Sequence, residues 1–189
     1  VTSSKVFTES LFAERGIHWI TRAHVSQVDA GEAHYETLDG AVRSFAFDFA
    51  MLLPPFTGVG LTAIDRFGGD ITAQLFQPNG FMKVDADYTS RPFEAWSPAD
   101  WPSTYQSPAY PNVFAVGIAF APPHAISKPR KAPSGAPIAP APPRTGMPSA
   151  TIGKAVARSV VDMIAGAPAP TRRASMAKDR KSTRLNSSH

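Results

Sequence analysis

The first part of the chain opens with a helical pattern of apolar positions. Residues 8–14 predict a short helix, with Thr8 as its N-cap and Gly16 as the residue after its end. Residues 17–20 follow as an apolar stretch short enough for a strand. The pattern therefore predicts a helix and then a β-strand before the chain becomes more polar.

A strict alternation of apolar and polar residues comes next. Residues 25–29 and 33–37 alternate on either side of the turn sequence Asp29-Ala30-Gly31-Glu32, which indicates a β-hairpin. A second turn at Leu38-Asp39-Gly40 leads into a third expected strand over residues 41–47. We expect a small antiparallel sheet from this part of the chain.

The middle of the chain replaces alternation with continuous apolar runs. Residues 49–53 form such a run, which suits a strand buried on both faces and ended by the two prolines that follow. Residues 80–85 and 112–116 predict two more strands, and Gly117 closes the second of them.

Proline dominates residues 121–148, so that segment is expected to be an extended connection.

A helical pattern of apolar residues follows the proline-rich segment. Ser149 is expected to cap the helix and Gly166 to end it, and its apolar positions recur at a spacing of four: Ile152, Val156, Val160 and Ile164.

The net charge of +4 does not describe a folded basic face. Residues 171–189 carry a net charge of +5, and the remaining 170 residues carry −1. This polar tail is expected to be disordered, and its last stretch, KSTRLNSSH, is typical of translated adapter sequence. We therefore expect no nucleic-acid partner.

Several kinds of site are excluded or disfavoured by the residue types. The chain has no cysteine, which removes disulfides, thiolate metal sites and cysteine nucleophiles from it. His18, His24 and His34 lack metal-ligand spacing, with no carboxylate cluster near them in sequence, and we predict no metal site. His124 is expected to be a structural loop histidine, with a hydrogen bond to a bound ligand as the alternative. The catalytic residues stay unknown.

The order of strand, glycine, extended loop and helix from residue 112 to residue 164 indicates a ligand site. A glycine at the end of a strand allows close approach to the backbone, and a helix N-terminus presents unpaired amides to negative charge. A phosphate, a ribityl chain or an electron-rich ring fits such a place. A tight strand exit beside a packed helix is the alternative.

Four sequence strings occur in the order found in flavoproteins of the disulfide-reductase superfamily, and together they cover about residues 7–165. They are FDFAMLLPPFTG (47–58), GFMKVDADY (80–88), YPNVFAVG (110–117) and PPRTGMPSATIGKAVARSV (142–160). The last string is similar to the segment that opens the final helix of the FAD domain in sulfide:quinone reductases. The chain thus resembles the C-terminal part of a protein of that branch.

The resemblance implies FAD as cofactor and a set of residues around it. Gly117 and Ile118 would contact the flavin through their backbone amides. Most superfamily members have an aspartate where this chain has Ile118, and the sulfide:quinone branch often has an aliphatic residue. Arg144 would place a positive charge near the flavin pyrimidine edge, with Thr145 and Gly146 placing helix-terminal amides beside it.

The resemblance also implies a quinone or another electron acceptor as partner. Phe56, Phe120 and Met147 are candidates for an apolar quinone slot. Sulfide:quinone reductases pass sulfur between cysteines, and the lack of cysteine puts the sulfide half-reaction in doubt. Trp96 and Trp101, together with Phe93 and Tyr105, are expected to form a surface aromatic cluster packed by prolines, with contact to a membrane interface as the alternative.

The expected fold class is α/β, with three parts. Residues 1–79 would end an NAD(P)-type nucleotide-binding domain, residues 80–166 would form the C-terminal part of a Rossmann-like FAD domain, and residues 167–189 the basic tail. The G-x-G-x-x-G fingerprint does not occur in the chain, so an N-terminal half of the same protein is an expected partner.

Two alternatives stay open: an NAD(P)H-dependent flavoprotein of the same superfamily, and a noncatalytic truncated fragment. The expected location is cytoplasmic or peripheral on a membrane surface, because the chain has no apolar run of spanning length.

Overall fold

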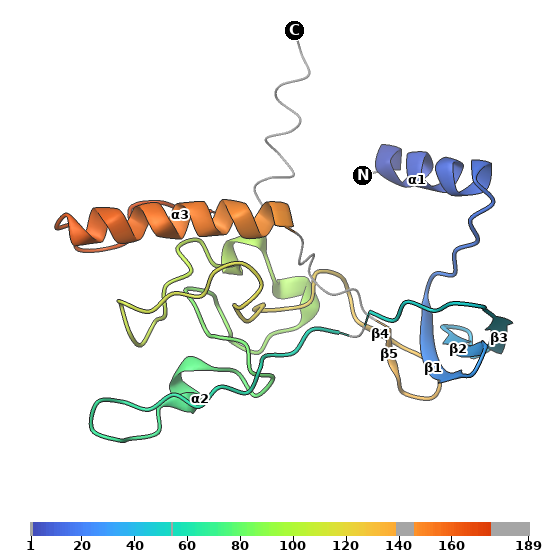
Figure 1. Ribbon diagram of the computed structural model, residues 1–189, viewed down its shortest axis with the longest axis horizontal. Coiled ribbons are helices and arrows are strands. Elements are labelled where there is room, and N and C mark those ends of the chain that lie inside the picture. Colours follow the sequence, from blue (N-terminus) through green and yellow to red (C-terminus); the bar gives the residue numbers. More distant parts are fainter. Residues whose placement is uncertain (1, 54, 139–145, 175–189) are drawn as a thin grey trace, which may run out of the picture. The chain divides into compact units, whose positions relative to one another are not determined.

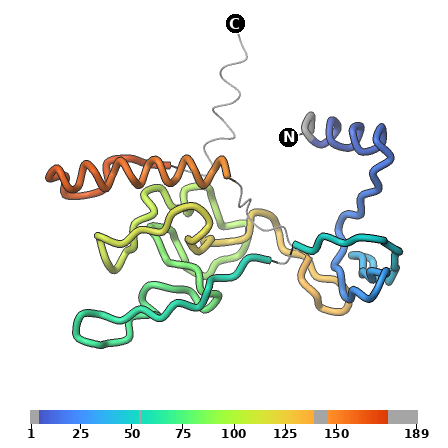
Figure 2. Tube along the Cα trace, viewed as in Figure 1, coloured from blue at the N-terminus to red at the C-terminus, as the bar shows by residue number. Residues whose placement is uncertain are grey.

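The chain mixes helix and sheet and forms two compact units (Figure 1), and all the strands that the structure describes lie in the first unit. The computed structural model describes residues 2–53, 55–138 and 146–174, and Figure 2 draws the others in grey. The first unit consists of Val1–Leu53 and Lys128–Ala139, and the second of Pro54–Ser127 and Pro140–His189. The expected boundary after residue 79 differs from this division, and the identification of the parts with nucleotide-type and FAD domains stays a prediction.

Helix α1, Thr2–Glu14, opens the first unit. It begins earlier than expected, so Thr8 lies inside the helix and is not its N-cap. Gly16 ends it as predicted, with a φ of 63°. The strand expected over residues 17–20 is wrong: these residues form no ladder among the described residues, and Trp19 instead meets the ring of Phe12 edge-on.

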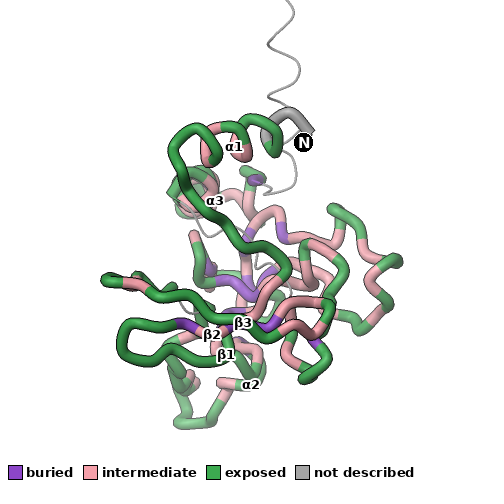
Figure 3. The backbone as a smooth tube through the Cα atoms, turned by 90° about the vertical axis from the view of Figure 1, so that its right-hand side faces the viewer, coloured by how far each residue is buried: buried purple, intermediate pink, exposed green. Residues whose placement is uncertain are grey.

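The predicted antiparallel sheet is confirmed. Strands β1 (Ala23–Asp29), β2 (Glu32–Thr37) and β3 (Val42–Ala46) lie in the order β1-β2-β3. Both turns between them rest on glycine in the left-handed region, Gly31 and Gly40. The central strand β2 carries the buried residues of the sheet, which Figure 3 marks in purple.

The proline-rich segment contains a hairpin that the sequence did not predict. Its strands are β4 (Arg130–Lys131) and β5 (Pro137–Ile138). The N–H of Ser134 at its tip donates to Oε1 of the buried Glu36 over 3.1 Å. The segment is therefore not a plain extended connection, at least up to residue 138.

The strand expected over residues 49–53 is wrong. These residues are extended, belong to no ladder among the described residues, and expose their large apolar side chains. A strand buried on both faces needs neighbours on both edges, and the described residues supply none.

Short elements and single bridges build the second unit. Helix α2 (Thr72–Leu75) and the 3₁₀ turns η1 (Phe93–Ala95) and η2 (Pro98–Asp100) are its only named elements before the last helix, within the described residues. The strands expected at 80–85 and 112–116 are reduced to isolated bridges: Met82 pairs with Phe76 and Phe120, and Phe114 pairs with Gln106.

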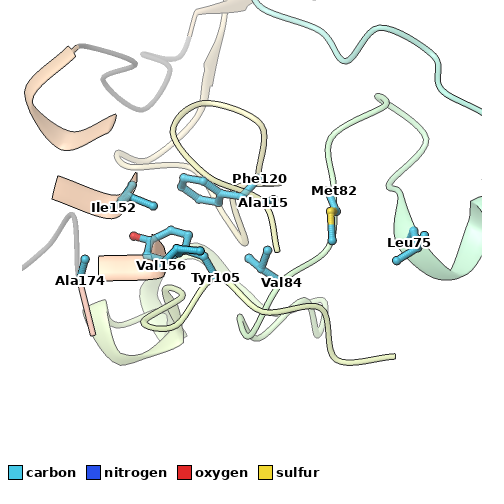
Figure 4. Close-up of a cluster of buried hydrophobic side chains, with 9 residues drawn as sticks. All are labelled: Leu75, Met82, Val84, Tyr105, Ala115, Phe120, Ile152, Val156 and Ala174. Atoms are coloured by element: carbon cyan, nitrogen blue, oxygen red, sulfur yellow. The ribbon is translucent and has the colours of Figure 1, made fainter. Parts of the chain in front are cut away.

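Helix α3, Gly146–Ile164, covers the core of the second unit. It begins before Ser149, so Ser149 is a residue of its first turn and not its cap. Ile152 and Val156 are buried as predicted, whereas Ile164 is exposed. Figure 4 shows Ile152 and Val156 beside Tyr105 and Phe120 in this core.

Residues 167–174 differ from the disordered tail that the sequence predicts. The backbone N–H of Arg172 donates over 3.0 Å to Oγ of Ser159, a residue of α3 that is completely buried. The N–H of Ala174 donates to the carbonyl of Ser103 over 2.9 Å, and Ala174 joins the core. The predictions for residues 175–189 lie outside the described residues. Among the helices described, none is long and apolar enough to cross a bilayer.

Candidate functional site

The turn at Gly117 lies against the first turn of α3. Gly117 has a φ of 67°, a conformation that favours glycine, and the N–H of Ala119 closes the turn onto the carbonyl of Val116 over 3.3 Å. A Cβ built on Gly117 would lie 3.5 Å from Cβ of Ser149. The sequence predicted both parts of this arrangement, and the structure brings them together.

Backbone hydrogen bonds hold the residues after Gly117 to the segment around Met82. The N–H of Met82 donates to the carbonyl of Ala119 over 3.0 Å, and the N–H of Ala121 returns to the carbonyl of Met82 over 2.7 Å. Phe120, between them, points into the core, where its ring meets Tyr105 edge-on at 5.2 Å between centroids. The turn at Gly117 is therefore anchored on its C-terminal side.

Asp85 fixes the chain on the other side of Tyr105. Its carboxylate accepts hydrogen bonds from the backbone N–H groups of Ser103 (3.1 Å), Thr104 (2.8 Å) and Tyr105 (2.6 Å), and from the hydroxyl of Ser103. Tyr105 is fully buried with a φ of 60°, which is unusual for a non-glycine residue. Asp85 thus organises a turn.

Tyr88 ties two of these segments together. Its hydroxyl donates to the carbonyl of Ala121 over 3.0 Å and accepts from the N–H of Val84 over 3.1 Å. Burial raises the pKa of Tyr88 to about 12, so the phenol stays protonated and keeps donating at neutral pH.

The residues predicted to surround a flavin fall into two groups. Gly117 lies in the turn beside Ser149 of α3, Gly146 is the first residue of α3, and Ile118 follows Gly117 and is exposed. Arg144 and Thr145 lie outside the described residues. Their assignment to the flavin stays a prediction.

The three candidates for a quinone slot differ in burial. Phe56 and Met147 are exposed, whereas Phe120 belongs to the core and touches Trp101 and Tyr105. An apolar ligand would meet Phe56 and Met147 more readily than Phe120. Their grouping into one slot stays a prediction.

The predicted surface aromatic cluster is confirmed only in part: Trp96 and Trp101 both lie against His124, whereas Tyr105 is fully buried in the core. The His124 ring stacks on Trp96 at 4.7 Å and meets Trp101 edge-on at 5.4 Å. Arg91 lies over Trp96 at 4.8 Å and pairs with Asp87. This packing favours a structural role for the two tryptophans.

His124 itself is anchored on one side only. Its Nδ1 lies 2.7 Å from the carbonyl of Ala125, which makes Nδ1 the protonated nitrogen of the neutral ring. Its Nε2 is buried and has no hydrogen-bond partner among the described residues. Nearby, the backbone N–H of Ser97 holds the pKa of Asp100 below its usual range, with Arg91 adding to the effect.

One histidine of the first unit does have carboxylates nearby, contrary to the expectation. The hairpin places Nε2 of His34 3.1 Å from Oδ2 of Asp29 and 3.9 Å from Oε2 of Glu32. Cross-strand pairing produces this proximity, which residue spacing does not reveal. Within the described ranges no group of three or more such side chains is arranged to hold a metal ion.

The arrangement at Gly117 fits an electron-rich or negatively charged group. The first backbone N–H groups of a helix lack intrahelical acceptors, and α3 begins beside a turn that carries no side chain at Gly117. The described residues around it offer neither a cysteine nor a metal cluster for covalent or metal chemistry. A group bound there would meet the unpaired backbone N–H groups at the start of α3.

Comparison with known proteins gives one relative and one solved structure of the same kind. No family model matches the chain. The sulfide-quinone reductase of Aquifex aeolicus (strain VF5) is 31% identical over 168 residues, which are 89% of this chain and 32% of the relative. The X-ray structure of the sulfide:quinone oxidoreductase from that bacterium matches 88% of the chain with a TM-score of 0.58 and 27% identity.

The chain spans about a third of the length of the relative that it matches. Sequence and fold agree with the resemblance seen in the four strings. The chain is a homologue of sulfide-quinone reductases, matching about one third of such a protein.

Proposed function

We propose that the chain forms one wall of the flavin site in a longer FAD-dependent oxidoreductase. That protein would pass electrons from a reduced donor through FAD to a quinone or a similar acceptor. The placement of the Gly117 turn beside Ser149 in the first turn of α3 supports the proposal, because the resemblance assigns both the turn and the start of this helix to the flavin. The homology to sulfide-quinone reductases supports it.

When bound, FAD supplies the redox chemistry, and the chain supplies position and charge. The backbone amides of Gly117 and Ile118 would contact the flavin, and the amide of Gly146 would face its pyrimidine edge. Arg144 and Thr145 would complete this edge with a positive charge and a further amide. A positive charge there favours the reduced, anionic ring.

The pyrophosphate of FAD would be held by the rest of the longer protein. The chain lacks the G-x-G-x-x-G fingerprint, which is the motif that binds this group at a helix N-terminus. The chain is accordingly assigned to the C-terminal part of a Rossmann-like FAD domain, preceded by the end of a nucleotide-type domain.

The acceptor is assigned to an apolar slot for which Phe56, Met147 and Phe120 are the candidates. Because quinones partition into the hydrocarbon of a bilayer, the longer protein is expected to touch a membrane surface peripherally. Sulfide is not assigned as donor, because the chain has no cysteine to carry sulfur.

A chimera tests the proposal directly. This chain would replace the matching third of the Aquifex aeolicus sulfide-quinone reductase, and bound flavin would be measured by its absorbance after purification. We expect the chimera to retain FAD and to reduce a short-chain quinone. A chimera that folds by circular dichroism but holds no flavin would contradict the proposal.

A matched pair of glycine variants sharpens the test. In the chimera, Gly117→Val is expected to weaken FAD binding by at least about tenfold, equivalent to about 1.4 kcal/mol. Gly153→Ala on α3, where an added Cβ meets nothing within 4 Å, is expected to leave binding unchanged. Equal flavin content in both variants would remove Gly117 from the site.

The donor is tested in the same chimera. Sulfide is expected not to bleach the flavin if sulfur transfer depends on cysteines from the replaced third. Rapid bleaching by sulfide would restore sulfide as the donor.

A further inference from the structure

The chain turns back on itself after α3. The helix ends at Ile164, and Gly166 follows with a φ of 105°, a conformation that favours glycine. The next residues, 167–174, return to the helix, where the backbone N–H of Arg172 donates to Oγ of Ser159 over 3.0 Å. We call residues 167–174 the docked segment. Its last residue, Ala174, is buried in the same core as Tyr105, as Figure 4 shows.

The two arginines of the docked segment have different partners. Nε of Arg172 lies 3.5 Å from Oδ2 of Asp162, which belongs to α3 itself. Nη1 of Arg173 instead donates to Oγ of Ser103 over 3.0 Å, and this partner lies 70 positions earlier in the chain. Both arginine side chains are exposed, and exposed contacts of this kind add little to stability by themselves. The importance of Arg173 therefore depends on what Ser103 holds in turn.

The hydroxyl of Ser103 lies between a guanidinium and a carboxylate. A guanidinium only donates hydrogen bonds and an ionised carboxylate only accepts them. The hydroxyl therefore accepts from Arg173, and its single proton points to Oδ2 of Asp85 over 3.1 Å. The backbone N–H of Ala174 also donates to the carbonyl of Ser103, over 2.9 Å. The docked segment thus fixes both the position of Ser103 and the direction of its hydroxyl.

From Asp85 the contacts continue to the turn at Gly117. The carboxylate of Asp85 accepts from the backbone N–H of Tyr105 over 2.6 Å and so holds this residue in its left-handed conformation. The carbonyl of Tyr105 accepts from the N–H of Ala115 over 3.0 Å, two residues before Gly117. A continuous series of hydrogen bonds therefore leads from the guanidinium of Arg173 to the strand end that carries the turn.

These contacts close a ring with α3. The first turn of α3 lies against Gly117 through Ser149, and the docked segment is held by Ser159 of the same helix. The turn is thus tied to α3 at one side directly and at the other through the docked segment. A backbone turn that is fixed before a ligand arrives binds that ligand more tightly, because less ordering is left to do on binding.

We propose that Arg173 is a positioning residue for the Gly117 turn. It acts through the hydroxyl of Ser103 and the carboxylate of Asp85, and it sets where the backbone amides of the turn lie beside α3. The inference rests on the proposed function, in which these amides contact the flavin. Arg173 therefore serves the flavin site without being a flavin ligand.

Amide hydrogen exchange in the 189-residue chain tests the positioning directly. Arg173→Ala is expected to speed exchange of the amides of Ala115 and Ala119 at least about threefold, because both are hydrogen-bonded next to the turn. The melting temperature is expected to stay unchanged, because the side chain of Arg173 is exposed. Arg172→Ala is the matched control, and it is expected to leave both amides as they are, because its partner lies on α3. Unchanged exchange in Arg173→Ala, or equal acceleration in both variants, would overturn the proposal.

A double variant tests whether Arg173 acts through Ser103. In a Ser103→Ala background the hydroxyl that Arg173 holds is missing, so Arg173→Ala is expected to speed exchange no further. Arg173→Lys keeps a charged donor and is expected to restore the slow exchange of the arginine. Effects of the two alanine substitutions that simply add would overturn the proposed route.

The chimera adds a flavin readout. Arg173→Ala is expected to weaken FAD binding about three- to tenfold, the factor that corresponds to one net hydrogen bond. At saturating FAD it is also expected to change the visible circular dichroism of the bound flavin, and Arg173→Lys is expected to restore both. Weaker binding that only follows a lower melting temperature, with an unchanged spectrum, would overturn the proposal.

The two readouts separate this inference from the proposed function. A chimera that holds no flavin even with Arg173 in place would contradict the proposed flavin site, and exchange at Ala115 and Ala119 in the isolated chain would still decide whether Arg173 positions the turn. Faster exchange together with unchanged flavin binding and spectrum would leave the positioning standing and remove the turn from the flavin.

Discussion

Gly58→Ala is expected to destabilise the second unit through a clash between two backbone segments. A Cβ built on Gly58 lies 2.0 Å from the carbonyl carbon and oxygen of Gly80 and 2.5 Å from its Cα. Real Cβ atoms essentially never approach other atoms within 3.0 Å. All of the obstructing atoms belong to the backbone, so no side chain can rotate away, and one of the two segments has to move.

The cost depends on which segment gives way. The turn at Gly80 is held by the N–H of Gly80 on the carbonyl of Gln77 and by the N–H of Gln77 on the carbonyl of Phe81, both over 2.8 Å. The segment at Gly58 has one such bond, from its N–H to the carbonyl of Asn79. The Gly58 segment should therefore move. We expect the free energy of unfolding to fall by about 1–2 kcal/mol. Losing the hydrogen bond costs about 1 kcal/mol, and overpacking that is relieved by the movement costs up to about 1 kcal/mol more.

Urea unfolding followed by tryptophan fluorescence measures this loss. In a Trp19→Phe background the signal comes from Trp96 and Trp101, which both belong to the second unit. Gly153→Ala is the control: it adds a methyl group to open space on α3 and is expected to stabilise by up to about 1 kcal/mol. A change below about 0.5 kcal/mol for Gly58→Ala, the range of ordinary surface substitutions, would refute the reasoning.

Three further perturbations test other contacts. Gly40→Ala would place a Cβ on a residue with a φ of 86° and 2.9 Å from Cγ of Pro133. We expect it to lower the free energy of unfolding by about 1–2 kcal/mol, measured by thermal melting. An unchanged melting temperature would contradict the contact between Gly40 and Pro133. Ser159→Ala leaves the N–H of Arg172 without its acceptor, and should cost about 1–3 kcal/mol and speed proteolysis after α3; resistance equal to wild type would argue against the docked segment. Burial raises the pKa of Tyr88 from 10.0 to about 12 in the folded protein. The stability that Tyr88 contributes to the fold is therefore fully present below pH 10.0 and is lost as the pH rises towards 12. Tyr88→Phe should lose this alkaline dependence in a pH series of unfolding experiments, and an unchanged dependence would assign it to another group.

The elements that the sequence predicts well are those with a local signal. The β1–β2 hairpin follows from alternation on both sides of a turn, and Gly31 supplies the left-handed residue that the turn needs. Helix α3 follows from a spacing of four that buries Ile152 and Val156. In each case the residues that form the structure are neighbours along the chain, so a single sequence contains the whole pattern.

The predictions that fail depend on residues far apart in the chain. The apolar run at residues 49–53 has the composition of a buried strand, but a strand needs neighbours that the described residues do not provide. The contact between Gly58 and Gly80 joins two glycines that are 22 positions apart, and the sequence pattern predicted only that Gly80 begins a strand over residues 80–85. The docking of residues 167–174 depends on one serine of α3, which a compositional argument for disorder does not register.

The candidate site shows the same division. Gly117 was predicted from its place after an apolar stretch, and its left-handed φ agrees with that. Ser149 was expected as a helix cap, yet its position in the first turn of α3 is what sets the distance to Gly117. The helix begins earlier than Ser149, the first obvious capping residue. The sequence therefore singled out Ser149 but assigned it the role of a cap, and not its place beside Gly117.

The position of the Gly117 turn depends on a residue that touches neither the turn nor α3. Asp85 holds the backbone of Tyr105 in a left-handed conformation that costs about 1–3 kcal/mol for a non-glycine residue. The carbonyl of Tyr105 in turn accepts from the N–H of Ala115 over 3.0 Å, two residues before Gly117. The strain persists because the carboxylate of Asp85 accepts from four donors around it. A substitution at Asp85 is therefore expected to displace the turn, and a loss of flavin in such a variant would reflect position and not direct contact.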